Sequence, residues 1–131
     1  DGEGAKKFLT INVINAKSLG SAKKIAFSIA NSPLVKTAVA GEDPNWGRIA
    51  MGLGKSGEPV DVKKLKIKIG EYIVAENGKV SDNYDEKKLK EYMEWDAIEI
   101  EVNLKLGNDA FKCYTCDFTH DYIDINADYR N

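Results

Sequence analysis

The sequence predicts an α+β fold: a sandwich with a mixed or mainly antiparallel sheet and helices packed on one face. Several short segments alternate apolar with polar residues, as strands with one buried face do. Other stretches carry apolar residues at three- and four-residue spacing, as on one side of a helix. The order of strand, helix, strand and helix, followed mostly by strands, is typical of such a two-layer arrangement.

The first half of the chain contains two predicted strands and two predicted helices. Residues 9–13 alternate as a strand, and an apolar stripe over residues 19–30 predicts a helix that ends at an Asn-Ser-Pro sequence. Residues 35–40 are expected to form a short buried strand. A second helix should run from about residue 44 to residue 53, with Asp43 as its cap.

The second half is predicted to be mostly strands, with one helix. Asn-Gly between two apolar segments is a strong hairpin signal. The most regular alternation of apolar and polar residues in the chain follows the predicted helix and indicates a strand. A Gly-Asn turn after it reverses the direction of the chain and leads into another strand. The expected elements are a strand at 65–69, a hairpin turn at 77–78, a helix at 85–93, a strand at 98–106, a strand at 110–118 and a last strand at about 122–126.

Length and composition restrict the classes of protein. The 131 residues are expected to form a single domain, residues 1–131. Nineteen basic and twenty-one acidic side chains give a net charge of −2, which argues against nucleic-acid binding. No apolar run approaches the roughly 20 residues that span a bilayer, so we expect no membrane segment. Two cysteines and the absence of a leader favour a cytoplasmic protein, and a start at Asp1 suggests a processed or partial chain.

Three motifs suggest cofactors or catalysis but lack the necessary context. Gly52–Gly57 matches a dinucleotide pattern, yet a helix is expected before it where a strand is required. Cys113 and Cys116 have the spacing of a metal pair, but His120 is the only histidine and zinc needs four ligands. His120 has no evident orienting partner for a role as a base. We therefore predict no metal and no organic cofactor.

Three further segments are unusual for ordinary helix or strand. In residues 1–5, glycines flank Glu3 and expose one carboxylate. Residues 41–48 combine turn residues with a helix start, a Trp and an Arg. Residues 126–131 are dense in hydrogen-bonding groups, and the only two arginines beside seventeen lysines lie in these last two segments. The alternative explanations of these features are a flexible end for residues 1–5, an ordinary capped helix for residues 41–48 and structural ion pairs for the two arginines.

Together these segments resemble the ornithine acetyltransferase family, also called bifunctional glutamate N-acetyltransferases. The family pattern Asp-Gly-Glu-Gly-Ala-Thr-Lys stands here at residues 1–7, with Lys6 in place of Thr. The matches extend from end to end of the chain but correspond to only the last part of the family's precursor. They comprise residues 1–7, 30–38, 41–48, 114–117 and 121–130.

The resemblance implies an enzyme of arginine biosynthesis. The precursor of such enzymes cleaves itself before a threonine, which becomes the nucleophile of the β chain. This threonine takes an acetyl group from N-acetylornithine and passes it to glutamate, while the α chain contributes the oxyanion hole. Some members also accept acetyl-CoA as a donor. The expected partners are the α chain and the missing N-terminal part of the β chain, in an α2β2 assembly.

The resemblance also assigns residues. This chain begins after the family's nucleophile, so we expect no catalytic residue in it and no activity of the chain alone. The family's substrate contacts fall at Glu3, Asn126 and Asn131. Asn131 departs from the usual Thr or Ser, and Lys6 is a second departure, next to the Glu3 segment. The Asp43–Arg48 segment is interpreted as structural support near the site and not as a direct substrate contact.

Two other readings stay open. A self-cleaving threonine amidohydrolase or aminopeptidase would use water in place of glutamate as the acyl acceptor. A non-catalytic assembly or amino-acid-binding domain would lack an Ala-Thr cleavage motif upstream. The residues that precede Asp1 in the complete protein would discriminate among the three.

Overall fold

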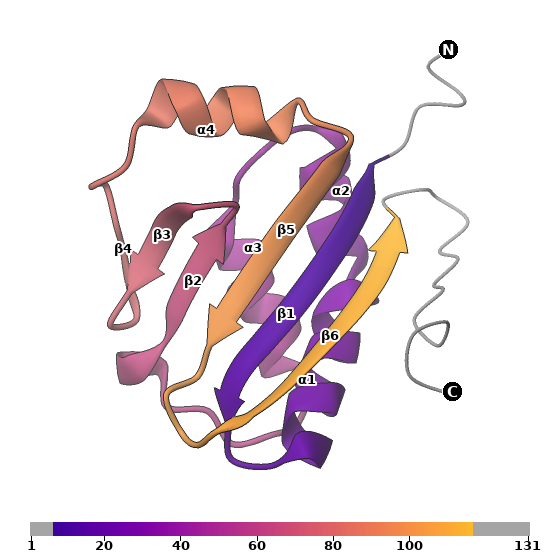
Figure 1. Ribbon diagram of the computed structural model, residues 1–131, viewed down its shortest axis with the longest axis vertical. Helices are drawn as coiled ribbons and strands as arrows, with labels where there is room; N and C mark the ends of the chain where they lie inside the picture. The colour runs from indigo at the N-terminus through magenta and orange to yellow at the C-terminus, as the bar shows by residue number, and fades with distance from the viewer. Residues whose placement is uncertain (1–6, 117–131) are drawn as a thin grey trace.

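The computed structural model describes residues 7–116 (Figure 1). A sheet forms one layer, and α1, α2 and α3 lie behind it in the view of Figure 1. The elements in chain order are β1 (Phe8–Ala16), α1 (Leu19–Ala30), α2 (Pro33–Ala40), α3 (Trp46–Gly54), a short 3-10 helix (Val62–Lys64), β2 (Lys66–Ile69), β3 (Tyr72–Glu76), β4 (Lys79–Val80), α4 (Glu86–Met93), β5 (Ala97–Asn103) and β6 (Asp109–Cys116).

The six strands form one mixed sheet in the order β4-β3-β2-β5-β1-β6. β1 and β5 are parallel, and the other neighbouring pairs are antiparallel. The predicted α+β fold, with a mixed or mainly antiparallel sheet and helices packed on one face, is confirmed. Within the described residues, no helix is both long and apolar enough to span a bilayer.

The core lies between the sheet and the three helices. Leu9, Ile11 and Val13 of β1 have no exposed surface, and the polar residues between them face the other side. Ile25 and Ile29 of α1 are equally buried against this face. The apolar side chains at every second position of β1 therefore pack against those at three- and four-residue spacing in α1. The two sets form one apolar layer, because the period of each element places its apolar residues on one side.

The prediction of a strand at residues 35–40 is wrong, because this segment is the helix α2. The Ser32 hydroxyl accepts from the Val35 amide at 3.3 Å, and Pro33 occupies the first turn, where its missing N–H costs nothing. Val35 and Val39 are buried four residues apart, which is helical spacing. The periodicity of such a short apolar run does not distinguish a strand from a helix. Here the Ser-Pro sequence at its start favours the helix.

Within residues 7–116, the other expected elements form with small shifts in their boundaries. The hairpin between β3 and β4 turns at Asn77 and Gly78, with φ of 55° and 75°, as the Asn-Gly pair predicts. α4 begins one residue after its cap, Asp85. The strand expected at 98–106 ends at Asn103. The last predicted strand, at about 122–126, lies outside the described residues.

Candidate functional site

The two ends of the described chain meet at one end of the sheet. Phe8 at the start of β1 is the register partner of Cys116 at the end of β6, and Figure 1 shows the indigo start of β1 beside the yellow end of β6. The segments that carry the expected substrate contacts therefore join the structure on adjacent strands. Glu3, Asn126 and Asn131 themselves lie outside the described residues.

Lys7, the first described residue, is held at this corner by two acceptors. Its ammonium donates to the Trp95 carbonyl oxygen at 2.8 Å and lies 3.4 Å from the Glu42 carboxylate. The Lys7 side chain is only 10% exposed. Next to it, the Phe8 amide donates to the Asp96 carbonyl oxygen at 2.7 Å. The start of β1 is thus joined both to the entry of β5 and to the loop between α2 and α3.

The loop between α2 and α3 begins with a helix cap of unusual composition. The Asp43 amide donates to the Ala38 carbonyl oxygen at 2.8 Å, and the Glu42 amide donates to the Val39 carbonyl oxygen at 3.0 Å. This is the Schellman pattern, whose left-handed position is usually taken by glycine. Here Glu42 occupies the left-handed position, with φ of 60°. Gly41 precedes this position by one residue and has φ of −84°.

Within the Asp43–Arg48 segment, the structure changes the predicted cap of α3. The Asn45 side-chain oxygen accepts from the Arg48 amide at 3.1 Å, so Asn45 rather than Asp43 is the N-cap of α3. The prediction of Asp43 as the cap is wrong, because the helix begins at Trp46 and only Asn45 directly precedes it. The Arg48 guanidinium donates to the Leu34 carbonyl oxygen at 3.2 Å and joins α3 to α2.

Loss of the Asn45 cap should destabilise the protein modestly. Asn45→Ala removes the acceptor for the Arg48 amide and is expected to lower the free energy of unfolding by about 1 kcal/mol. Asn45→Asp keeps the acceptor and should stay close to the parent. Urea-induced unfolding followed by circular dichroism measures both, and equal midpoints for the two variants would contradict the assignment of the cap.

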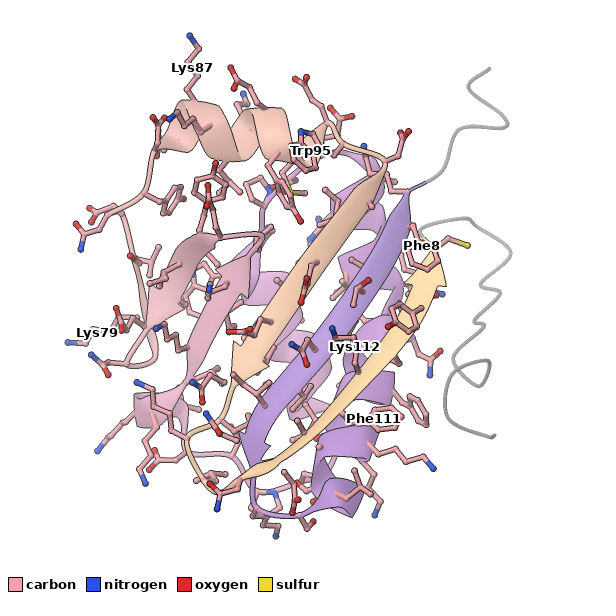
Figure 2. All side chains as sticks on the ribbon, viewed as in Figure 1. Phe8, Lys79, Lys87, Trp95, Phe111 and Lys112 are labelled. Carbon is pink, nitrogen blue, oxygen red and sulfur yellow. The ribbon has the colours of Figure 1, made fainter. Side chains whose placement is uncertain are left out.

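The face of the sheet opposite α1, α2 and α3 has an aromatic pair at the same corner. Phe8 and Tyr114 stack with ring centroids 5.7 Å apart, and Phe8 is 51% exposed. Figure 2 shows Phe8 and Lys112 on this face, turned toward the viewer. The polar residues Thr10 and Asn12 follow Phe8 along β1. This face is the one that the described helices α1–α3 leave uncovered.

The two cysteines lie on opposite faces of β6, as their spacing predicts. Cys113 is buried against α1, with its sulfur 3.7 Å from the Ala26 carbonyl oxygen, whereas Cys116 is partly exposed. Burial raises the pKa of the Cys113 thiol to about 12. Among residues 7–116, no three His, Cys, Asp or Glu side chains are grouped as metal ligands would be. His120 lies outside the described residues.

The burial of Cys113 predicts a dependence of stability on pH. The thiol titrates near 9.0 when unfolded and near 12 when folded, so the folded state keeps its proton more tightly. The stability that this tighter proton binding contributes is fully present below pH 9 and is lost as the pH rises to 12. Over this range the free energy of unfolding falls by at most about 1.4 kcal/mol per pH unit. Cys113→Ala should flatten this part of the profile, measured by urea unfolding from pH 8 to 11. Parallel profiles would contradict the assignment.

Sequence reasoning did not identify Lys7 and Glu42 as a pair. Their contact depends on the packing of β1 against a loop 35 positions further along the chain. Two weak signals were present. A lysine directly precedes the alternating strand, and a glutamate follows the glycine at a helix end where the glycine itself would ordinarily take the left-handed position.

Comparisons with known proteins agree on one family. The model of the ArgJ family matches residues 1–131. The chain is 53% identical over 131 residues to the arginine biosynthesis bifunctional protein ArgJ of Gluconobacter oxydans and 53% identical to that of Brucella melitensis. Each match covers the whole chain but only 31% and 32% of the relative, so the chain spans about a third of their length.

A solved structure is similar as well. The crystal structure of the arginine biosynthesis bifunctional protein ArgJ from Bacillus halodurans is 39% identical to this chain, with a TM-score of 0.83. The match covers 98% of this chain and 61% of that one.

Proposed function

Because the chain belongs to the ArgJ family, we propose that it is the carboxyl-terminal part of the β chain of an acetyltransferase in arginine biosynthesis. This enzyme moves an acetyl group from N-acetylornithine to glutamate. The observation that carries the proposal is the family match over all 131 residues, joined to the coverage of only about a third of the bifunctional relatives.

The proposed chemistry is acyl transfer through a covalent intermediate. A threonine hydroxyl attacks the acetyl carbonyl carbon of N-acetylornithine, the C–N bond breaks, and ornithine leaves with the proton on its amine. The amine of glutamate then attacks the threonine ester, which gives N-acetylglutamate and restores the hydroxyl. Both the threonine and the oxyanion hole lie on polypeptide outside this chain, so the chain contributes to substrate binding.

Glu3, Asn126 and Asn131 are the proposed contacts with the amino-acid substrates. The Glu3 carboxylate would face the substrate ammonium or the transferred amide, and the Asn126 amide can donate and accept. Asn131 would supply an amide where the family has a hydroxyl. The pairing of Phe8 with Cys116 supports this grouping, because both segments leave from adjacent strands. Glu3 is five residues from Phe8 and can lie no further than about 18 Å from it.

The proposal includes the rest of the enzyme. The α chain and the missing N-terminal part of the β chain would complete the site, in a cytoplasmic α2β2 assembly without nucleic acid, membrane, metal or organic cofactor. N-acetylornithine and glutamate are the proposed small-molecule substrates. Acetyl-CoA is a second acetyl donor to be tested, because the resemblance implies that some members of the family accept it.

The experiment compares the intact protein that contains this chain with the 131-residue chain alone. Formation of N-acetylglutamate from N-acetylornithine and glutamate is followed, with acetyl-CoA as the donor in a second arm. The intact protein should turn over and the chain alone should not. Turnover by the chain alone would refute the placement of the nucleophile outside it. Release of acetate without N-acetylglutamate would indicate an amidohydrolase instead.

A further inference from the structure

An open cavity of about 480 Å³ lies between α4 and the turn from β2 to β3. Three aromatic rings and three charged side chains form its walls. The lining residues are Glu71, Tyr72, Lys88, Glu91, Tyr92 and Trp95. We propose that this cavity binds a small organic cation of the guanidinium type. The proposed function gives no role to any of these residues, and the inference does not depend on it.

The three aromatic rings form adjoining walls of the cavity. The Tyr92 ring centroid lies 5.0 Å from that of Trp95 and 6.3 Å from that of Tyr72, with planes inclined by 53° and 59°. Trp95 is 61% exposed, and Figure 2 shows it at the end of α4. The faces of aromatic rings attract cations, and the face of Trp attracts them most strongly. A cation from solvent can therefore reach the ring that binds it best.

The central ring of this wall is fixed in place. The Tyr92 hydroxyl oxygen accepts from the Glu99 amide at 2.9 Å. The ring packs against Gly70, which has φ of 62° and where an added Cβ would lie 2.8 Å from ring carbons. The Trp95 amide donates to the Tyr92 carbonyl oxygen at 2.9 Å, so the two aromatic residues are also joined through the backbone. A wall that is already ordered lowers the entropy cost of binding a ligand.

The charges around the cavity favour a positive ligand. Glu71 and Glu91 contribute two carboxylates, against one ammonium from Lys88. Among residues 7–116, no ion pair joins Lys88 to either carboxylate. Desolvation raises the pKa of the Tyr72 hydroxyl, and the negative charge of Glu71 raises it further, with smaller contributions from Asp85 and Glu91. The same negative charges would stabilise a bound cation.

A guanidinium group suits this combination of rings and carboxylates better than a metal ion or an ammonium. It is planar, stacks on aromatic rings and offers a fork of N–H donors to carboxylates, whereas an ammonium is a strongly hydrated point charge. A hard metal ion takes six or more oxygen ligands, and within residues 7–116 no three His, Cys, Asp or Glu side chains are grouped to hold one. The volume is in the range of small-molecule sites.

The test is a ligand-observed NMR titration of the intact protein that contains this chain. The probe is n-butylguanidinium, and n-butylurea is its neutral isostere. We expect the guanidinium probe to bind with a Kd on the order of 1 mM and the urea to bind at least about tenfold more weakly. Equal affinity for the two would overturn the proposal, because the site would then not recognise charge. Absence of binding by the guanidinium probe would overturn it too.

Substitutions at exposed positions locate the binding. Trp95→Ala should raise the Kd of n-butylguanidinium at least about fivefold through loss of the ring face, and Glu71→Gln combined with Glu91→Gln should do the same. Lys88→Ala should lower the Kd about twofold, because it removes a like charge. Glu86→Gln is the matched control, since Glu86 is exposed on α4 but does not line the cavity. A Kd that changes as much in Glu86→Gln as in the double variant would contradict the site.

An arginine elsewhere in the intact protein is a second source of the same group. Hydroxyl-radical oxidation of Trp95, read by mass spectrometry, distinguishes the two sources. A Trp95 that is oxidised in the intact protein and protected by n-butylguanidinium supports a free ligand. A Trp95 that is protected without the probe, together with no binding of the probe, would overturn the free ligand and indicate that polypeptide covers the cavity.

Discussion

From the proposed function, Glu3→Ala or Asn126→Ala in the intact protein is expected to lower kcat/KM for the proposed amino-acid substrates by more than about tenfold, on the order of 1.5–3 kcal/mol. A carboxylate that faces an ammonium makes a charge-assisted contact, and its loss leaves the substrate charge without a partner. The Asn126 amide can both donate and accept a hydrogen bond, so its replacement by alanine removes two interactions at once. The kinetics should be measured with both N-acetylornithine and glutamate.

Matched controls are available on the exposed surface. Glu86→Ala and Asn83→Ala remove the same side-chain types at exposed positions in and before α4, and they should leave kcat/KM at the parent level. A loss of kcat/KM in Glu3→Ala and Asn126→Ala is specific to the site only if Glu86→Ala and Asn83→Ala do not show it. Unchanged kinetics for both Glu3→Ala and Asn126→Ala would remove these residues from the substrate site.

The second large effect concerns stability. Ile11→Ala should lower the free energy of unfolding by about 3–4 kcal/mol, because it removes buried methyl groups and leaves a cavity in a layer that cannot fully collapse. Ile11 has no exposed surface and lies between Ile100 of β5 and Cys113 of β6. Urea-induced unfolding measures the change from the shift in midpoint at a constant slope.

Thr10→Ala is the control, since Thr10 is the neighbour of Ile11 on the same strand but faces the side of the sheet without α1–α3. Its expected cost is below about 1 kcal/mol. The pair of variants tests which face of β1 is packed. Equal destabilisation by the two substitutions would contradict the one-sided packing of helices on the sheet.

Local patterns predicted most of the elements because their causes are local. An Asn-Gly pair strongly favours positive φ at both positions for reasons local to the two residues, and it forms the turn at residues 77–78. The alternation of β5 and the stripe of α1 follow from the periods of strand and helix. The failure at residues 35–40 has a local cause too, because the run is too short for its period to separate strand from helix.

For the candidate site, the sequence determined the residue types but not which segments are in contact. The sequence alone determined the family resemblance and the residue types that suit an amino-acid substrate, since these depend only on the order of residues. It also indicated that residues 41–48 are unusual. It did not show that this segment contacts the start of β1, nor that Lys7 and Glu42 form a pair.

Only the tertiary structure decided which segments are neighbours. Phe8 lies beside Cys116, and Lys7 contacts Trp95 and Glu42, although these residues are far apart in the chain. Such contacts follow from the order of strands in the sheet and from the placement of helices on one face. That arrangement minimises the exposed apolar surface of the whole domain, a sum over all residues that no local window of sequence contains.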